Sequence, residues 1–151
     1  MDWDQAGARR GRLRVRTLVT LRWLLLAIET GATVLSGMVL GHDAAYPLAI
    51  GVIAAGGWVN LLTNVASPGQ KLFSNTEATA QLGFDLVQIA ALLFLVGGAA
   101  SPFMVLLIAP ISLAAYALPT RQTIALSILA SLLAVLLALI AWPFGGHGLH
   151  E

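Results

Sequence analysis

Long apolar stretches alternate with short polar segments along most of the chain. A transmembrane helix needs about 20 predominantly apolar residues, and five stretches come close to that length or exceed it. They run over about 18-40, 46-66, 78-96, 102-118 and 120-142. We therefore predict an all-α fold, a polytopic transmembrane bundle of five helices. Its expected parts are a basic tail at 1-16, a membrane domain at 17-143 and a second tail at 144-151.

Turn-forming residues mark the ends of these stretches. The polar segment 67-75 predicts a loop, and Gly97-Gly98 closes the third helix. Ser101 and Pro102 open the fourth helix as N-cap and first helical residue. Five of the six prolines lie at or beyond predicted helix ends. Pro110 alone falls inside one, which makes it a candidate flexible point.

Composition supports a membrane protein and removes several kinds of chemistry. The chain has 58% hydrophobic and 10% charged residues, whereas a soluble domain carries about 25% charged residues. The absence of cysteine excludes disulfides and thiolate sites, so any redox role needs a bound cofactor or another chain. His147 and His150 lack a third ligand, and we expect no metal site.

Basic residues are distributed unevenly along the chain. In a five-helix arrangement all eight fall on one side of the membrane: Arg9, Arg10, Arg12, Arg14, Arg16 and Arg22 at or before the start of the first helix, Lys71 in the 67-75 loop, and Arg121 before the fifth helix. This bias predicts a cytoplasmic N-terminus and an extracytoplasmic tail at 144-151. We interpret the arginines as a topology signal that contacts lipid headgroups, and we expect no nucleic-acid partner.

Two carboxylates lie within the predicted spans, at Glu29 and Asp85. Insertion of an Asp at a helix centre costs roughly 2.5–3.5 kcal/mol. Gln81 and Gln88 share a helix face with Asp85; Asn60 and Asn64 mark a similar face on the second helix. These groups either hydrogen-bond between helices and hold the bundle together, or they form the polar wall of a ligand pocket.

The segment 97-103, Gly-Gly-Ala-Ala-Ser-Pro-Phe, also allows two interpretations. It is a helix end, a tight turn and a capped helix start. Its glycines also permit close approach of a ligand, the start of the next helix offers free N–H donors, and Phe103 offers an aromatic face. The segment is therefore a candidate site for the head group of a lipophilic quinone.

Several segments together resemble the membrane domain of RegB/PrrB/ActS-type redox sensor histidine kinases. The resemblance covers nearly the whole chain from Arg14 onward. The segments that carry it are Arg14-x-Arg16-Thr17-Leu18-x-x-Leu21-Arg22-Trp23, Trp58-x-Asn60-Leu61-Leu62, Phe84-Asp85-x-x-Gln88 and Gly97-Gly98-x-x-Ser101-Pro102-Phe103.

This resemblance implies a bacterial inner-membrane protein that senses the quinone pool, with ubiquinone or a related quinone as cofactor. The family's quinone-associated heptapeptide falls on Gly97, Gly98, Pro102 and Phe103, and Ser101 stands where the family has Asn. Asp85 and Gln88 are the second choice for cofactor-binding residues.

The family pairs six membrane helices with a homodimeric cytoplasmic kinase that phosphorylates a response regulator. We expect this five-helix chain to end before the sixth helix, either as a fragment or as a kinase-less relative. By itself it should carry no catalytic residues and no phosphotransfer activity.

Two alternatives from other classes stay open. A small transporter or proton-relay protein would use Glu29 and Asp85 as its path. A non-catalytic membrane assembly protein would need neither a ligand nor a flux of ions.

Overall fold

The computed structural model describes residues 15–40, 46–67, 72–96 and 101–141. Its elements are all helical, which confirms the predicted fold class. They are α2 (Val15–Leu40), α3 (Tyr46–Ala66), α4 (Asn75–Leu95), η3 (Pro102–Leu107), α5 (Ile108–Ala117) and α6 (Thr120–Ala141).

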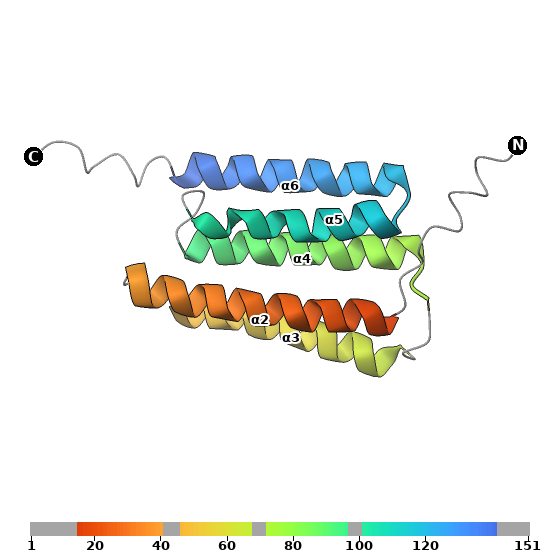
Figure 1. Cartoon of the computed structure of the whole chain (residues 1–151), viewed down its shortest axis with the longest axis horizontal. Helices are drawn as coiled ribbons and strands as arrows, with labels where there is room; N and C mark the ends of the chain where they lie inside the picture. Colours follow the sequence, from red (N-terminus) through yellow and green to blue (C-terminus); the bar gives the residue numbers. More distant parts are fainter. Residues whose placement is uncertain (1–14, 41–45, 68–71, 97–100, 142–151) are drawn as a thin grey trace, which may run out of the picture.

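The helices lie side by side and alternate in direction (Figure 1). α4 is the central element, because it contacts α2, α3, α5, α6 and η3. Its buried aliphatic side chains include Leu82, Leu86, Ile89 and Leu93. α2 packs mainly against α3, and α5 packs against α6.

Four helices, α2, α3, α4 and α6, are long and apolar enough to cross a membrane, and the helix over Pro102–Ala117 is shorter. Large apolar side chains are exposed on the outside of the bundle, among them Trp58, Val65, Leu132 and Leu139. In lipid these side chains need no protein cover, so the exposure fits a multi-pass membrane protein.

The fourth predicted helix is not one continuous α-helix. It begins as the 3₁₀ segment η3 and becomes α-helical at Ile108. Pro110 explains the change, because its ring would clash with the carbonyl of Leu106 in an α-helix. Pro110 lies inside a helix, as predicted, in the first turn of α5. The steeper 3₁₀ rise lengthens η3 and α5 together to about 27 Å, close to a hydrocarbon core of about 30 Å.

α4 begins at Asn75, three residues before the predicted start. Ser74 caps it: the Ser74 Oγ accepts from the Glu77 N–H at 3.1 Å, and the Ser74 N–H donates to Glu77 Oε2 at 2.8 Å. This reciprocal pair satisfies two N–H groups that the helix itself leaves without partners.

Candidate functional site: a buried polar layer beside a cavity

A buried ion pair joins α2 to the middle of α4. Arg22 Nε lies 3.1 Å from Asp85 Oδ1, and both side chains are 5% exposed. Because α2 begins at Val15, Arg22 lies two turns inside the helix. Its assignment to the start of the first helix was wrong, so the predicted charge bias rests on the seven other basic residues.

The Arg22 guanidinium extends the contact to α3. Its Nη1 donates to Gln81 Oε1, and Gln81 Nε2 donates to Thr63 Oγ1 at 3.0 Å. Its Cζ lies 5.4 Å from the centre of the Phe84 ring, within the range of a cation–π interaction. Nη2 is buried and has no hydrogen-bond partner among the described residues.

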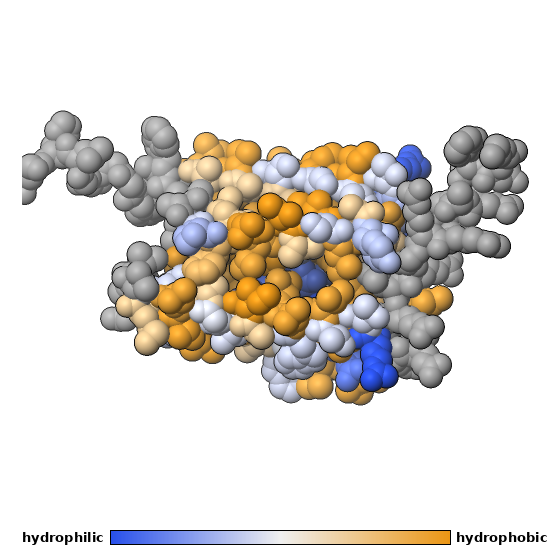
Figure 2. All heavy atoms as spheres, in the orientation of Figure 1, coloured by the Kyte–Doolittle hydropathy of each residue, from blue (hydrophilic) through white to orange (hydrophobic). Residues whose placement is uncertain are grey.

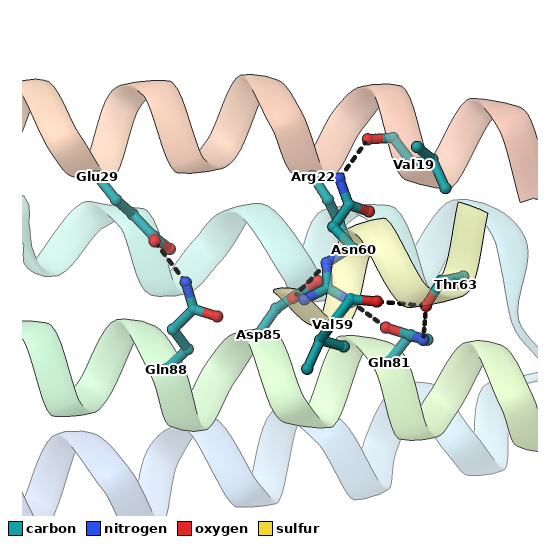
Figure 3. Close-up of polar contacts among 9 residues, drawn as sticks. All are labelled: Val19, Arg22, Glu29, Val59, Asn60, Thr63, Gln81, Asp85 and Gln88. Atoms are coloured by element: carbon teal, nitrogen blue, oxygen red, sulfur yellow. Dashed lines mark hydrogen bonds and ion pairs between the residues drawn. The ribbon is translucent and has the colours of Figure 1, made fainter. Parts of the chain in front are cut away.

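A second polar contact between α2 and α4 lies further along the same helices. Gln88 Nε2 donates to Glu29 Oε2 at 2.7 Å, and both side chains are buried (Figure 3). Gly56 of α3 makes room for this contact, because a Cβ at that position would collide with the Gln88 amide. Glu29 Oε1 and Gln88 Oε1 have no partner in the described part of the chain.

The polar face of α3 differs from the prediction at one position. Asn60 is buried, and its Nδ2 donates to the Val19 carbonyl at 3.1 Å. Asn64 is exposed instead, and the adjacent Thr63 takes part in the contacts. Successive residues of an α-helix are turned by about 100°, so Asn64 faces away when Thr63 faces α4. We call Arg22, Glu29, Asn60, Gln81, Asp85 and Gln88 the polar layer.

The ion pair borders a cavity of about 310 Å³ between α2, α4 and α5. Figure 2 shows this face hollowed, with hydrophilic atoms at the bottom of a largely hydrophobic surface. The lining residues are Leu21, Arg22, Leu24, Leu25, Ile28, Leu82, Asp85, Ala109, Pro110, Ser112, Leu113 and Tyr116. The cavity walls are thus mainly apolar, and the polar lining residues are the ion pair and the hydroxyl-bearing Ser112 and Tyr116.

The structure describes only part of the candidate segment 97-103. Gly97 and Gly98 lie outside the described residues. Ser101 is the predicted N-cap of η3, since its Oγ accepts from the Phe103 N–H at 3.3 Å, and Pro102 follows as the first helical residue. The structural interpretation of this part of the segment is confirmed.

Phe103 connects the candidate segment to the polar layer. It lines a void of about 10 Å³ together with Glu29 and Thr33. Such a void holds about one water molecule, which is far less than an aromatic ring. Asp85, the second choice from the sequence, borders the larger cavity, whereas Gln88 faces Glu29.

Arg22 is the site residue that sequence reasoning missed. The signal was present, because Arg22 falls inside the predicted helix 18-40 and a charge there needs a partner in the bundle. The two carboxylates that a relay would use have separate partners: Asp85 contacts Arg22, and Glu29 contacts Gln88. No contact between the described side chains links the two carboxylates into a path.

Comparisons with known proteins identify similar membrane domains. Residues 2–147 match the family model of the PilS-like transmembrane domain. The chain is 33% identical over 117 residues to sensor histidine kinase RegB of Cereibacter sphaeroides. The aligned region covers 78% of this chain and 25% of that protein. It therefore spans about a quarter of the length of this curated relative. No solved structure matches the chain.

Proposed function

Since the chain belongs to the family of PilS-like transmembrane domains, we propose that it is the membrane sensor domain of a redox-responsive histidine kinase. In this proposal it senses the quinone pool of the bacterial inner membrane. The signal passes to a cytoplasmic kinase portion, which acts as a homodimer and phosphorylates a response regulator. The N-terminus lies in the cytoplasm.

The observation that carries the proposal is the polar layer. Buried polar and charged groups are expensive inside a membrane and often mark functional sites. Here they join three helices through side-chain contacts, Arg22 to Asp85 and Gln81, and Gln81 to Thr63. A ligand that changes these contacts changes the relation of α2 to α3 and α4. A sensor domain needs such a change in helix arrangement in order to pass on the state of its ligand.

Sensing requires that the ligand distinguishes two arrangements of the helices. A ligand shifts such an equilibrium only by its difference in affinity for the two states. Quinone and hydroquinone differ in hydrogen bonding, because a quinone carbonyl only accepts and a hydroquinone hydroxyl also donates. The free donor of Arg22 and the carboxylate of Asp85 are groups that respond to this difference.

The segment 101–103 provides a second route from a bound quinone to the polar layer. Phe103 lines the same void as Glu29, so a displacement of the Phe103 ring into this void would press on Glu29, which accepts from Gln88. The resemblance to RegB-type sensors favours a contribution of this segment to quinone binding.

Quinone binding to the purified full chain in lipid nanodiscs tests the proposal. We expect saturable binding with unequal affinities for the oxidised and reduced forms of a short-tailed ubiquinone. Phe103→Ala should weaken binding, whereas Phe94→Ala, which removes an exposed ring from α4, should leave it unchanged. Equal affinities for both redox forms would contradict redox sensing, and equal binding by both variants would remove Phe103 from the site.

A further inference from the structure

The cavity between α2, α4 and α5 has the size and walls of a site for a small lipophilic molecule. Its volume of about 310 Å³ lies at the lower end of the range of about 300–1,000 Å³ for small-molecule sites. The side chains of Leu24 and Ile28 at its edge are more than 40% exposed on the outside of the bundle. A molecule dissolved in the membrane can therefore enter from the lipid side.

The guanidinium of Arg22 determines which polar group a ligand of this cavity needs. A guanidinium has only donors and no acceptor. Arg22 uses Nε and Nη1 on Asp85 and Gln81, and its Nη2 has no partner among the described residues. An unmatched buried donor is unfavourable, and Arg22 lines the cavity, so a ligand whose hydrogen-bond acceptor reaches the guanidinium from the cavity would be favoured.

The depth of the ion pair decides between two sources of such an acceptor. Asp85 is the eleventh of the 21 residues of α4, which places it about 15 Å along the helix from either end. Phospholipid ester and phosphate oxygens belong to the interface, outside the hydrocarbon core. An acceptor that reaches the depth of Arg22 and Asp85 from the lipid phase must arrive on a molecule that is itself apolar.

We propose that this cavity binds the ring of a membrane-dissolved quinone, with one ring carbonyl directed at the guanidinium of Arg22. The inference rests on the proposed quinone sensing and places the ring in this cavity, so that Phe103 acts on binding through the void it shares with Glu29. The bound ring lies between α2 and α5, two helices that do not pack closely against each other. Binding therefore acts on the spacing of α2 relative to α5 and on the contact of α2 with α4.

Cavity-blocking variants of the full chain in nanodiscs test this site. Ala109 lines the cavity and is exposed, so Ala109→Phe should fill it and weaken binding of short-tailed ubiquinone tenfold or more. Ala115→Phe is the matched control, because Ala115 is exposed on the same helix and does not line the cavity. Its affinity should stay within about twofold of the unsubstituted protein, the scatter expected of surface changes.

Arg22→Lys tests the polar contact and avoids an unpaired Asp85. The ammonium keeps the charge but lacks the planar fork of donors. Arg22→Lys should therefore lose one charge-assisted hydrogen bond to the quinone carbonyl. We expect it to bind short-tailed ubiquinone about tenfold more weakly, or weaker still. Far-ultraviolet circular dichroism confirms that each variant keeps its helices.

The outcomes separate this inference from the proposed function. If quinone binds the unsubstituted chain and Ala109→Phe equally well, the cavity assignment is overturned while quinone sensing stands. A phospholipid that co-purifies with the chain and that quinone does not displace from the cavity overturns it as well. If no quinone binds the unsubstituted chain, the proposed function itself fails, and the cavity site fails with it.

Discussion

The two halves of this bundle are held together by different chemistry, although α4 belongs to both. On the side of α2 and α3, buried polar side chains cross between helices, as in the pairs Arg22–Asp85 and Gln88–Glu29. On the side of α5 and α6, the buried contacts are aliphatic and small: Leu107, Ala114, Ala117, Leu126, Ala130 and Leu137. There the described side-chain hydrogen bond between helices is that of Thr123 Oγ1 to the Ala114 carbonyl.

This difference indicates that the two halves have different roles in the bundle. Small residues let helices approach closely in lipid, where apolar burial gives little driving force. The α4–α5–α6 half is therefore a packed support. In the polar half each contact depends on a specific partner, so a ligand or a substitution can alter one contact and change how α2 lies against α4. We expect the two halves to respond very differently to substitution.

The largest effect should come from removing one partner of the ion pair. Arg22→Leu leaves the Asp85 carboxylate buried without its counter-charge, and such changes cost about 3–5 kcal/mol. Unfolding of the purified chain in mixed detergent micelles measures the loss. The double variant Arg22→Leu/Asp85→Leu should recover most of the stability, because replacing both members of a buried pair is often neutral. A single variant as stable as the unsubstituted chain would contradict the role of the pair.

A smaller loss should follow a change at the contact between α3 and the Gln88 amide. In Gly56→Ala the new methyl group collides with that amide and displaces it from Glu29, with an expected loss of about 1–3 kcal/mol in the same unfolding experiment. Gly57→Ala is the matched control, since nothing lies within 4 Å of its added Cβ. If both variants have the same stability, the tight approach at Gly56 is not needed for the fold.

In the apolar half, a glycine-to-alanine substitution at Gly83 should be tolerated. A Cβ at Gly83 would lie 3.7 Å from Leu126 Cδ2, which is an ordinary van der Waals contact. Gly83→Ala also removes the conformational cost of a glycine within a helix, so stability should rise by up to about 1 kcal/mol. A loss as large as that of Gly56→Ala would show that the two halves do not differ in the way described.

The sequence predicted the helices well because membrane insertion leaves few options. Apolar length and the proline positions located five helices to within three residues at each end, and the resemblance to RegB-type membrane domains is confirmed by the comparisons. The 3₁₀ start of the fourth helix was not predicted. Pro110 changes the backbone of the preceding turn, where its ring would clash with the carbonyl of Leu106, and apolar length does not reveal such a change.

The site was only partly predictable, because partners across helices depend on rotation and register. The common face of Gln81, Asp85 and Gln88 followed from their spacing along one helix. That Asp85 pairs with Arg22 and Gln88 with Glu29 depends on how α2 lies against α4, which no local pattern contains. The cavity is likewise formed by three helices and has no signature in any one of them.

Photolabelling with an azido-substituted ubiquinone, followed by mass spectrometry of the digested chain, tests the central claim most directly. If the quinone ring binds beside Arg22, labels should map to the cavity-lining stretches 21–28 and 109–116, and an excess of unlabelled quinone should remove them. Labels confined to residues 97–103, or spread evenly over the exposed side chains of α3 and α6, would contradict a quinone site at the ion pair.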